Sequence, residues 1–253
     1  MGFFMCKNDF NGRGMIWLFD LDNTLHNASH AIFPKISANM NAYLRGHVTN
    51  ADGSVLSDIQ ANALRVEYWK RFGATLLGIS RVLDRRAKDF LEAAHRFDDL
   101  SALVDAERGL QVLLRKLPGK KVLLTNSAYR YSQAILKQLK LHHCFSGHIA
   151  IERMRVFGRI SPKPSARFFR KLFAMLKVRS DDCVLVDDNI HILKVAKTAG
   201  MQTVLVTRYL NTDHYSEHAY PRPSRKKQIA RPVYVDMKIP SVRNLMHYVG
   251  RFR

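Results

Sequence analysis

Four short runs of apolar residues constrain the fold of this chain more than any other feature. Hydrophobicity in each run is continuous rather than alternating, which is typical of strands that are covered on both faces of a parallel sheet. The runs are Ile16–Phe19, Val122–Leu124, Val184–Val186 and Val204–Val206. The first three lead directly into Asp20, Thr125 and Asp187. Because ligands in such sheets bind beyond the carboxyl ends of the strands, we expect these polar residues to converge there.

Amphipathic patterns between the apolar runs predict helices. Apolar residues recur at three- and four-residue spacing from Ala166 to Leu176, from Ile135 to Leu139, and from Ile192 to Ala199, where Gly200 ends the pattern. Strands and helices therefore alternate along the chain. This order predicts an α/β fold with a doubly wound parallel sheet.

The segment from His26 to Leu100 interrupts this alternation because its patterns are helical throughout. We interpret residues 26–100 as a helical cap inserted after the first strand, and residues 15–25 plus 101–253 as the α/β core. A module at this place can close over a small ligand at the sheet edge. Within the C-terminal part of the core, we expect residues 211–232 to form a basic loop. A last short strand at Pro232–Val235 and a helix capped at Ser241 are expected to follow.

The chain is strongly basic, with 41 Lys and Arg against 21 Asp and Glu and a formal net charge of +20. Two interpretations are open: a nucleic-acid partner, or a generally basic surface that attracts small phosphorylated molecules. Basic residues are scattered along the chain, which favours the second. The one dense cluster is expected to be a solvated loop that the chemistry does not need; it comprises Arg222, Arg225, Lys226, Lys227 and Arg231.

Cellular location is predicted from three features of the sequence. No run approaches the roughly 20 apolar residues that cross a bilayer. The first 15 residues include Lys7, Asp9 and Arg13 and lack the pattern of a signal peptide. The three cysteines are widely spaced and form no paired motif, which suits a reducing compartment. We expect a cytoplasmic protein without a membrane partner; the oligomeric state is not indicated.

The strongest chemical signal is the segment Asp20-Leu21-Asp22-Asn23-Thr24 directly after the first strand. A strand periodicity of two places Asp20 and Asp22 on the same side. Two neighbouring carboxylates repel one another, so a hard divalent cation between them is implied. One carboxylate can attack phosphorus while the other transfers a proton to the leaving oxygen. The alternative is an acidic turn that only caps the next segment.

Three further motifs bear on this interpretation. Thr125-Asn126-Ser127 offers a hydroxyl and backbone amides to a phosphate, although it could simply cap a helix. Lys163 lies between Pro162 and Pro164, which restrain the backbone that carries its charge. Asp187-Asp188 can supply an oxygen ligand to a cation, or can cap the helix that follows.

These motifs together, each at a strand end and in this order, resemble the haloacid dehalogenase superfamily of phosphohydrolases from about Met15 to Leu210. The resemblance implies that Asp20 is the nucleophile and Asp22 the general acid/base. It implies phosphate binding by Thr125 and Lys163, and Mg²⁺ binding by Asp188.

The same resemblance extends to neighbouring positions. It implies that Asp20 and Asp22 join Asp188 in holding Mg²⁺, that Asn126 joins the phosphate site, and that Thr24 and Asp187 support it. Many members carry an Asp or Asn four residues after the metal-binding acid, where this chain has Ile192.

Within the superfamily, Asp187-Asp188 and the stretch from Tyr68 to Gly78 resemble the pyrimidine 5′-nucleotidase branch. This implies a nucleoside 5′-monophosphate as substrate, with Trp69 and Arg71 as cap residues that could contact it. Alternatives are a sugar phosphate or other small phosphorylated metabolite, or a non-catalytic nucleic-acid-binding protein on the same scaffold. A dehalogenase is disfavoured, because displacement of halide needs neither a leaving-group acid nor a metal. His26 and His30 are expected to be surface or structural residues.

Overall fold

The computed structural model describes residues 14–82, 87–210 and 230–252. The chain divides into two compact units, and each is described by itself. The described part of the first, the core unit, is residues 14–27, 104–210 and 230–252. The described part of the second, the helical unit, is residues 28–82 and 87–103. The insert predicted from the sequence, residues 26–100, begins two residues earlier and ends three residues earlier than this unit.

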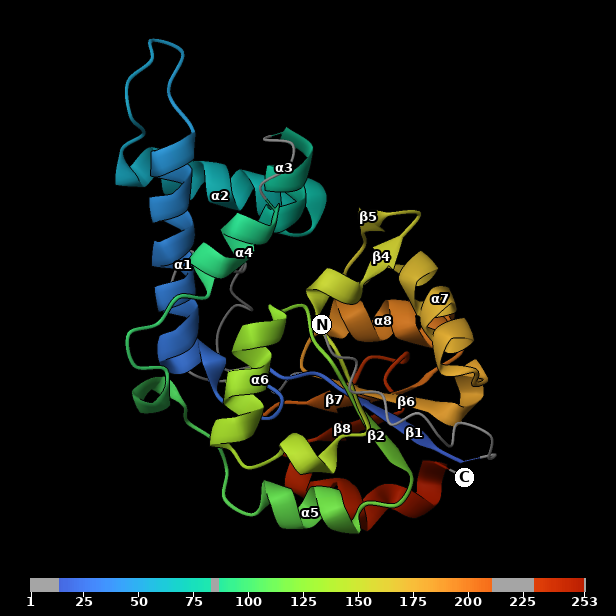
Figure 1. The fold of residues 1–253 in the computed structure, drawn as a ribbon. Coiled ribbons are helices and arrows are strands. Elements are labelled where there is room, and N and C mark those ends of the chain that lie inside the picture. Colours follow the sequence, from blue (N-terminus) through green and yellow to red (C-terminus); the bar gives the residue numbers. More distant parts are fainter. Residues whose placement is uncertain (1–13, 83–86, 211–229, 253) are drawn as a thin grey trace. The chain divides into compact units, whose positions relative to one another are not determined.

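The core unit contains a parallel sheet with the strand order β3-β2-β1-β6-β7-β8 (Figure 1). The strands are β1 (Ile16–Phe19), β2 (Lys120–Leu124), β3 (Gly147–Ile149), β6 (Cys183–Asp187), β7 (Gln202–Val206) and β8 (Met237–Ile239). All four apolar runs are strands of this sheet. The doubly wound α/β fold predicted from the sequence is confirmed.

Helices and 3-10 segments connect the strands of the core unit, and one 3-10 segment follows the last strand. The α-helices are α5 (Leu110–Lys116), α6 (Tyr129–Gln138), α7 (Ala166–Leu176) and α8 (Ile190–Thr198). The 3-10 segments are η2 (His142–Cys144), η3 (Ile151–Arg153), η4 (Ser180–Asp182) and η5 (Val242–Phe252). A small antiparallel hairpin, β4 (Arg155–Val156) and β5 (Arg159–Ile160), precedes α7. The three amphipathic patterns outside the insert thus correspond to α6, α7 and α8.

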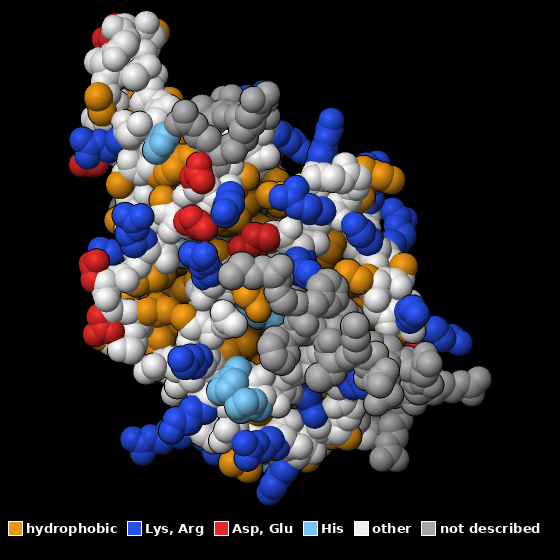
Figure 2. Space-filling view, in the orientation of Figure 1, with side chains coloured by type: hydrophobic (Ala, Val, Ile, Leu, Met, Phe, Trp, Pro, Cys, Tyr) orange, Lys and Arg blue, Asp and Glu red, His pale blue; other side chains and the backbone are white. Residues whose placement is uncertain are grey.

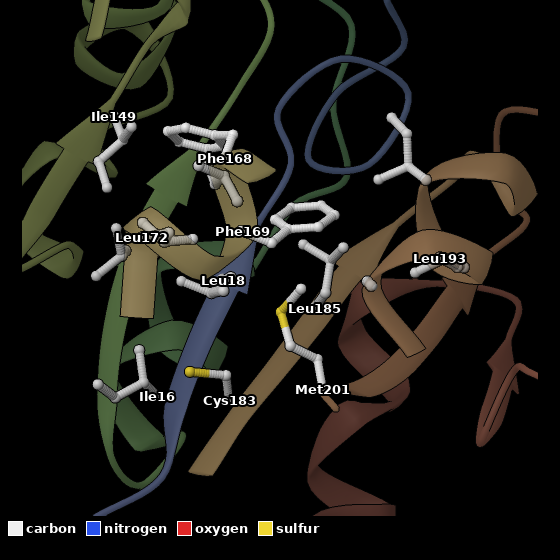
Figure 3. Packing of buried hydrophobic residues seen from close by; sticks show 14 of the residues in the cluster. Ile16, Leu18, Ile149, Phe168, Phe169, Leu172, Cys183, Leu185, Leu193 and Met201 are labelled. Carbon is white, nitrogen blue, oxygen red and sulfur yellow. The ribbon is translucent and has the colours of Figure 1, made fainter. Parts of the chain in front are cut away.

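Strand β1 lies inside the sheet and buries both of its faces. On one face, Ile16 and Leu18 belong to the cluster that contains the α7 residues Phe168, Phe169 and Leu172 (Figure 3). On the other face, the Trp17 ring meets Phe252 edge-on at 5.4 Å between centroids, and its Nε1 donates to the Pro118 carbonyl at 2.8 Å. Burial on both faces explains the continuous hydrophobicity of the run.

The last strand differs from the expected one. Pro232–Val235 is a turn in which the Val235 amide donates to the Pro232 carbonyl at 2.9 Å. The strand begins at Met237, because the Asp236 carboxylate before it accepts hydrogen bonds from the Thr203 backbone and from Lys197. These contacts fix the register of β8 on β7. The expected cap is present, since Ser241 Oγ accepts from the Arg243 amide at 3.0 Å.

The helical unit consists of α1 (Ala28–His47), α2 (Asp58–Phe72), α3 (Thr75–Val82), α4 (Ala87–Ala94) and η1 (Ser101–Leu103). Ser57 and Gln60 form a capping box at the start of α2, and Gly73, with φ 82°, ends it. No helix in the described ranges is long and apolar enough to cross a membrane.

Close packing of α2 against α3 depends on Gly78. A Cβ at this position would lie 2.4 Å from Cγ of Tyr68, whose ring is buried. The stretch from Tyr68 to Gly78, which carries part of the family resemblance, therefore has a packing function within the helical unit.

We expect Gly78→Ala to lower the free energy of unfolding by about 1–3 kcal/mol, because the added methyl group must displace the Tyr68 ring. Urea denaturation measures the change. Gly46→Ala is the matched control, since no atom lies within 4 Å of a Cβ there. The control should be neutral or stabilising by up to about 1 kcal/mol. Equal effects of the two substitutions would contradict the packing function of Gly78.

Candidate active site

Three strands of the sheet deliver polar residues to the same edge. Asp20 follows β1, and its amide donates to the Val186 carbonyl of β6 at 2.9 Å. Thr125 follows β2, and its amide donates to the Ile149 carbonyl of β3 at 3.0 Å. Asp187 is the last residue of β6. Because β1 pairs in parallel with both β2 and β6, these strand ends lie side by side.

Lys163 joins two of these strand ends. Its Nζ donates to Asp20 Oδ1 at 2.8 Å and to Asp187 Oδ2 at 2.8 Å. The side chain is only 2% exposed, so the ammonium has exchanged water for two carboxylates. Burial alone would lower the pKa of Lys163, but the Asp187 and Asp20 carboxylates raise it above its ordinary value. Lys163 is therefore a fixed positive charge beside Asp20.

Asn126 positions the loop that carries Lys163. Its Nδ2 donates to the Lys163 carbonyl at 2.9 Å, and its Oδ1 accepts from the Lys163 amide at 3.0 Å. The sequence predicted that Asn126 contacts phosphate. In the structure both polar atoms of its side chain bind the Lys163 backbone, and its contact with phosphate stays a prediction. The side-chain hydroxyl of the neighbouring Thr125 accepts from the Ser127 amide at 3.0 Å.

Three carboxylates gather around this lysine. One oxygen from each of Asp20, Asp187 and Asp188 lies within 4.8 Å of the others, and Asp20 and Asp187 are buried. Burial is the main reason that the pKa of Asp20 is raised to about 7; the Lys163 charge acts against it, and the charges of Asp187 and Asp22 add to it. Burial and the Asp187 and Asp20 carboxylates likewise raise the pKa of Asp188. One ammonium does not neutralise three carboxylates.

A divalent cation fits this group. The ligands are carboxylate oxygens, which hard cations such as Mg²⁺ prefer, and their repulsion leaves negative charge for the cation to balance. The alternative that Asp187-Asp188 caps the next helix is not what the structure shows. Asn189 is the N-cap of α8, with Oδ1 accepting from the His191 and Ile192 amides. Ile192 itself is 8% exposed and belongs to the core cluster.

Asp22 lies in a different environment from Asp20. It accepts hydrogen bonds from His26 Nε2 at 2.9 Å, from Tyr131 Oη at 2.6 Å and from Ser127 Oγ at 2.5 Å. Burial would raise the pKa of Asp22, but the His26 hydrogen bond and charge, with those from Ser127 and Tyr131, lower it. Asp22 was expected to hold the metal with Asp20 and Asp188. It is not a member of the group formed by Asp20, Asp187 and Asp188.

Two of the three residues that bind Asp22 were not predicted from the sequence as partners in the site. His26 was expected to be a surface or structural residue, but it is fully buried and contacts Asp22 four positions before it. Tyr131 on α6 was not singled out. The only signal for His26 was that four-residue spacing, and Tyr131 gave none because 109 positions separate it from Asp22. Thr24, expected to support the site, is buried, and its Oγ1 lies 3.4 Å from Asp20 Oδ2.

The two cap residues predicted to contact substrate lie on α2 of the helical unit. Trp69 is half-buried, and Arg71 is exposed with its guanidinium 5.3 Å from the centre of the Phe72 ring. Their contact with a substrate stays a prediction. In the basic cluster, Arg222, Arg225, Lys226 and Lys227 lie outside the described residues. Arg231 is described, and its Nη1 donates to the Asp236 carbonyl at 2.8 Å.

Comparison with known proteins gives a consistent family. A model of the haloacid dehalogenase-like hydrolases matches residues 16–200. No curated protein matches the chain.

Solved structures share the fold at low sequence identity. A HAD phosphatase from Thermococcus onnurineus matches with a TM-score of 0.58 and 17% identity over 93% of this chain and 98% of that one. L-2-haloacid dehalogenase from Xanthobacter autotrophicus matches with a TM-score of 0.54 and 18% identity, over 94% of this chain and 98% of that one. YfnB from Bacillus subtilis, in a structure bound to magnesium, matches with a TM-score of 0.55 and 14% identity, over 94% of this chain and 100% of that one.

We expect Asp20→Asn to raise the melting temperature at pH 8 when divalent cations are chelated, by roughly 5 °C or more. A carboxyl with a raised folded-state pKa binds its proton more tightly when folded, so stability falls as pH rises from 3.8 to about 7. Asn resembles the neutral carboxyl and removes this loss. Melting curves of both proteins at pH 5 and pH 8 measure the difference in melting temperature, and this difference should be smaller at pH 5.

The exposed Asp181, which pairs with Arg179 at 2.6 Å, provides the control. Asp181→Asn should give no gain that depends on pH in this direction, because the hydrogen bond with Arg179 lowers the pKa of Asp181. A melting temperature of Asp20→Asn that stays at or below that of the unsubstituted protein at pH 8 would contradict the repulsion described here.

Proposed function

The chain belongs to the haloacid dehalogenase-like hydrolase family, and we propose that it is a magnesium-dependent phosphomonoester hydrolase that acts through an aspartyl-phosphate intermediate. The observation that carries the proposal is the ammonium of Lys163 held 2.8 Å from both Asp20 and Asp187, with Asp188 beside them. This arrangement supports a nucleophilic carboxylate with charge-balancing groups for a phosphate dianion.

Asp20 is the nucleophile in this proposal. One of its carboxylate oxygens bonds to phosphorus while the bond from phosphorus to the ester oxygen breaks and leaves its electrons on that oxygen. Lys163 offsets the repulsion between the carboxylate and the phosphate. Asp22 gives the leaving oxygen a proton and later takes one from the water that hydrolyses the aspartyl-phosphate.

The proton on Asp22 needs a source, because its hydrogen bonds lower its pKa in the phosphate-free protein. An arriving phosphate dianion acts in the opposite direction, since a nearby negative charge disfavours the ionised carboxyl. Substrate binding therefore favours the protonated form that the first step requires.

Asp20, Asp187 and Asp188 would hold Mg²⁺. When bound, the cation would balance the negative charge of the carboxylates and of the phosphate. Thr125 is proposed to bind phosphate, as its position after β2 suggests, while Asn126 fixes Lys163.

A dehalogenase is the competing hydrolase, since one of the similar solved structures is a dehalogenase. A halide leaves without a proton, and its displacement by a carboxylate needs no cation. The Asp22 network and the group of Asp20, Asp187 and Asp188 would then have no chemical function. The acid/base and the acidic group therefore favour phosphate esters.

The proposed substrate is a small phosphorylated metabolite, with a pyrimidine nucleoside 5′-monophosphate first and a sugar phosphate second. Trp69 and Arg71 are the proposed cap contacts. A nucleic-acid partner is less favoured, because Lys and Arg side chains are scattered over the face shown in Figure 2 rather than confined to one patch. A screen of nucleotides and sugar phosphates, with a 2-haloacid as the dehalogenase test, distinguishes these substrates.

Hydrolysis of p-nitrophenyl phosphate should require Mg²⁺ and Asp20. We expect chelation to abolish turnover and Mg²⁺ to restore it, whereas Asp20→Asn should be inactive under both conditions because an amide does not attack phosphorus. Asp188→Ala should raise the Mg²⁺ concentration needed for half-maximal rate. An enzyme indifferent to chelation would contradict the metal assignment, and activity in Asp20→Asn would contradict the nucleophile.

Lys163→Met should lower kcat by about 10²–10³, the usual cost of one preorganised electrostatic group. Steady-state kinetics with the same substrate measures this, with Lys171→Met on the exposed face of α7 as control. A loss below tenfold would mean that another basic residue supplies the charge.

A further inference from the structure

The two oxygens of the Asp22 carboxylate have different hydrogen-bond partners. Oδ1 accepts from His26 Nε2 at 2.9 Å and from Tyr131 Oη at 2.6 Å. Oδ2 accepts from Ser127 Oγ at 2.5 Å. A carboxylate offers about four lone-pair positions, two on each oxygen. The contacts on Oδ1 therefore use both of its positions, whereas Oδ2 keeps one.

Packing alone does not explain a histidine at position 26. Its side chain is fully buried, and Nδ1 has no hydrogen-bond partner among the described residues. An apolar side chain would fill such a place without leaving a buried ring nitrogen unpaired. The contact with Asp22 Oδ1 is what a histidine supplies there.

Tyr131 approaches Asp22 from a different part of the core unit. It lies in the first turn of α6 and is 3% exposed, with its hydroxyl toward Asp22. His26 comes from the loop after β1. Two buried donors from segments 105 positions apart thus meet at one oxygen of one carboxylate.

We propose that His26 and Tyr131 are positioning residues that occupy Oδ1 of Asp22 and thereby assign proton transfer to Oδ2. This inference rests on the proposed function, because it concerns the acid/base of that reaction. In the first step the proton passes from Oδ2 to the leaving ester oxygen as its bond to phosphorus breaks. Without the two donors only the Ser127 hydroxyl holds the carboxyl, which can then turn and present either oxygen.

The two positions call for different substitutions. His26→Leu removes the donor at similar size, whereas His26→Gln keeps an N–H donor near the place of Nε2. Tyr131→Phe removes only the hydroxyl. Tyr129→Phe is the matched control, because it also removes a tyrosine hydroxyl from α6. The Tyr129 ring stacks on His148, away from the hydrogen bonds to Asp22. Circular dichroism melts verify that each variant folds, and Tyr131→Phe carries the test should His26→Leu not fold.

The readout is kcat/KM for two substrates of similar shape, with Mg²⁺ present. p-Nitrophenolate leaves readily without a proton, whereas the phenolate of phenyl phosphate leaves poorly and needs one. Because kcat/KM includes only steps up to formation of the aspartyl-phosphate, it reports the effect of proton transfer to the leaving group and not the later hydrolysis step. Asp22→Asn provides the reference, since loss of general acid help costs about 10²–10⁴.

We expect His26→Leu and Tyr131→Phe to lower kcat/KM for phenyl phosphate by roughly tenfold or more, and for p-nitrophenyl phosphate by roughly threefold or less. His26→Gln should recover most of the loss, and Tyr129→Phe should resemble the unsubstituted protein. Equal losses on both substrates would overturn the inference and leave the proposed function standing. An unsubstituted protein that hydrolyses neither substrate would overturn both.

Discussion

The ammonium of Lys163, buried between Asp20 and Asp187, is the interaction around which the active-site edge is arranged. Neither carboxylate could remain ionised in this interior without a counter-charge, because burial strongly disfavours an isolated charge. The lysine in turn depends on the carboxylates, since an ammonium buried without any of them would carry an uncompensated charge. Asn126 fixes the lysine from the backbone side. The site is thus held together by ion pairs that link β1, β6 and the loop before α7.

Two carboxylates only two positions apart in the chain have opposite electrostatic environments. Asp20 faces other carboxylates, which with burial raise its pKa, whereas Asp22 faces three hydrogen-bond donors, which lower its pKa. Opposite shifts of the two pKa values allow neighbouring acids to perform different tasks at one pH. It comes from the neighbouring elements and not from the strand, because Ser127 and Tyr131 belong to the segment after β2.

Much of this arrangement was predictable from the sequence. Continuous apolar runs identified four strands, and the polar residues after them predicted that Asp20, Thr125 and Asp187 share one edge. Contacts that depend on the packing of a distant helix were not predictable, and Tyr131 is the clearest case. The predicted position of the last strand was wrong. Pro232–Val235 has the composition of a strand, but the contacts of the neighbouring Asp236 determine where pairing with β7 begins.

The strand order also determines when the site can form during synthesis. Strand β1 leaves the ribosome first, yet both of its neighbours in the sheet, β2 and β6, begin more than 100 residues later. Until then Asp20 has neither its lysine nor its sheet partners, whereas the intervening helices can already make contacts with one another. Such long-range pairing is intrinsically slow, because the chain must close a large loop first. The apolar run that precedes Asp20 therefore lacks its native sheet partners while the intervening residues are synthesised.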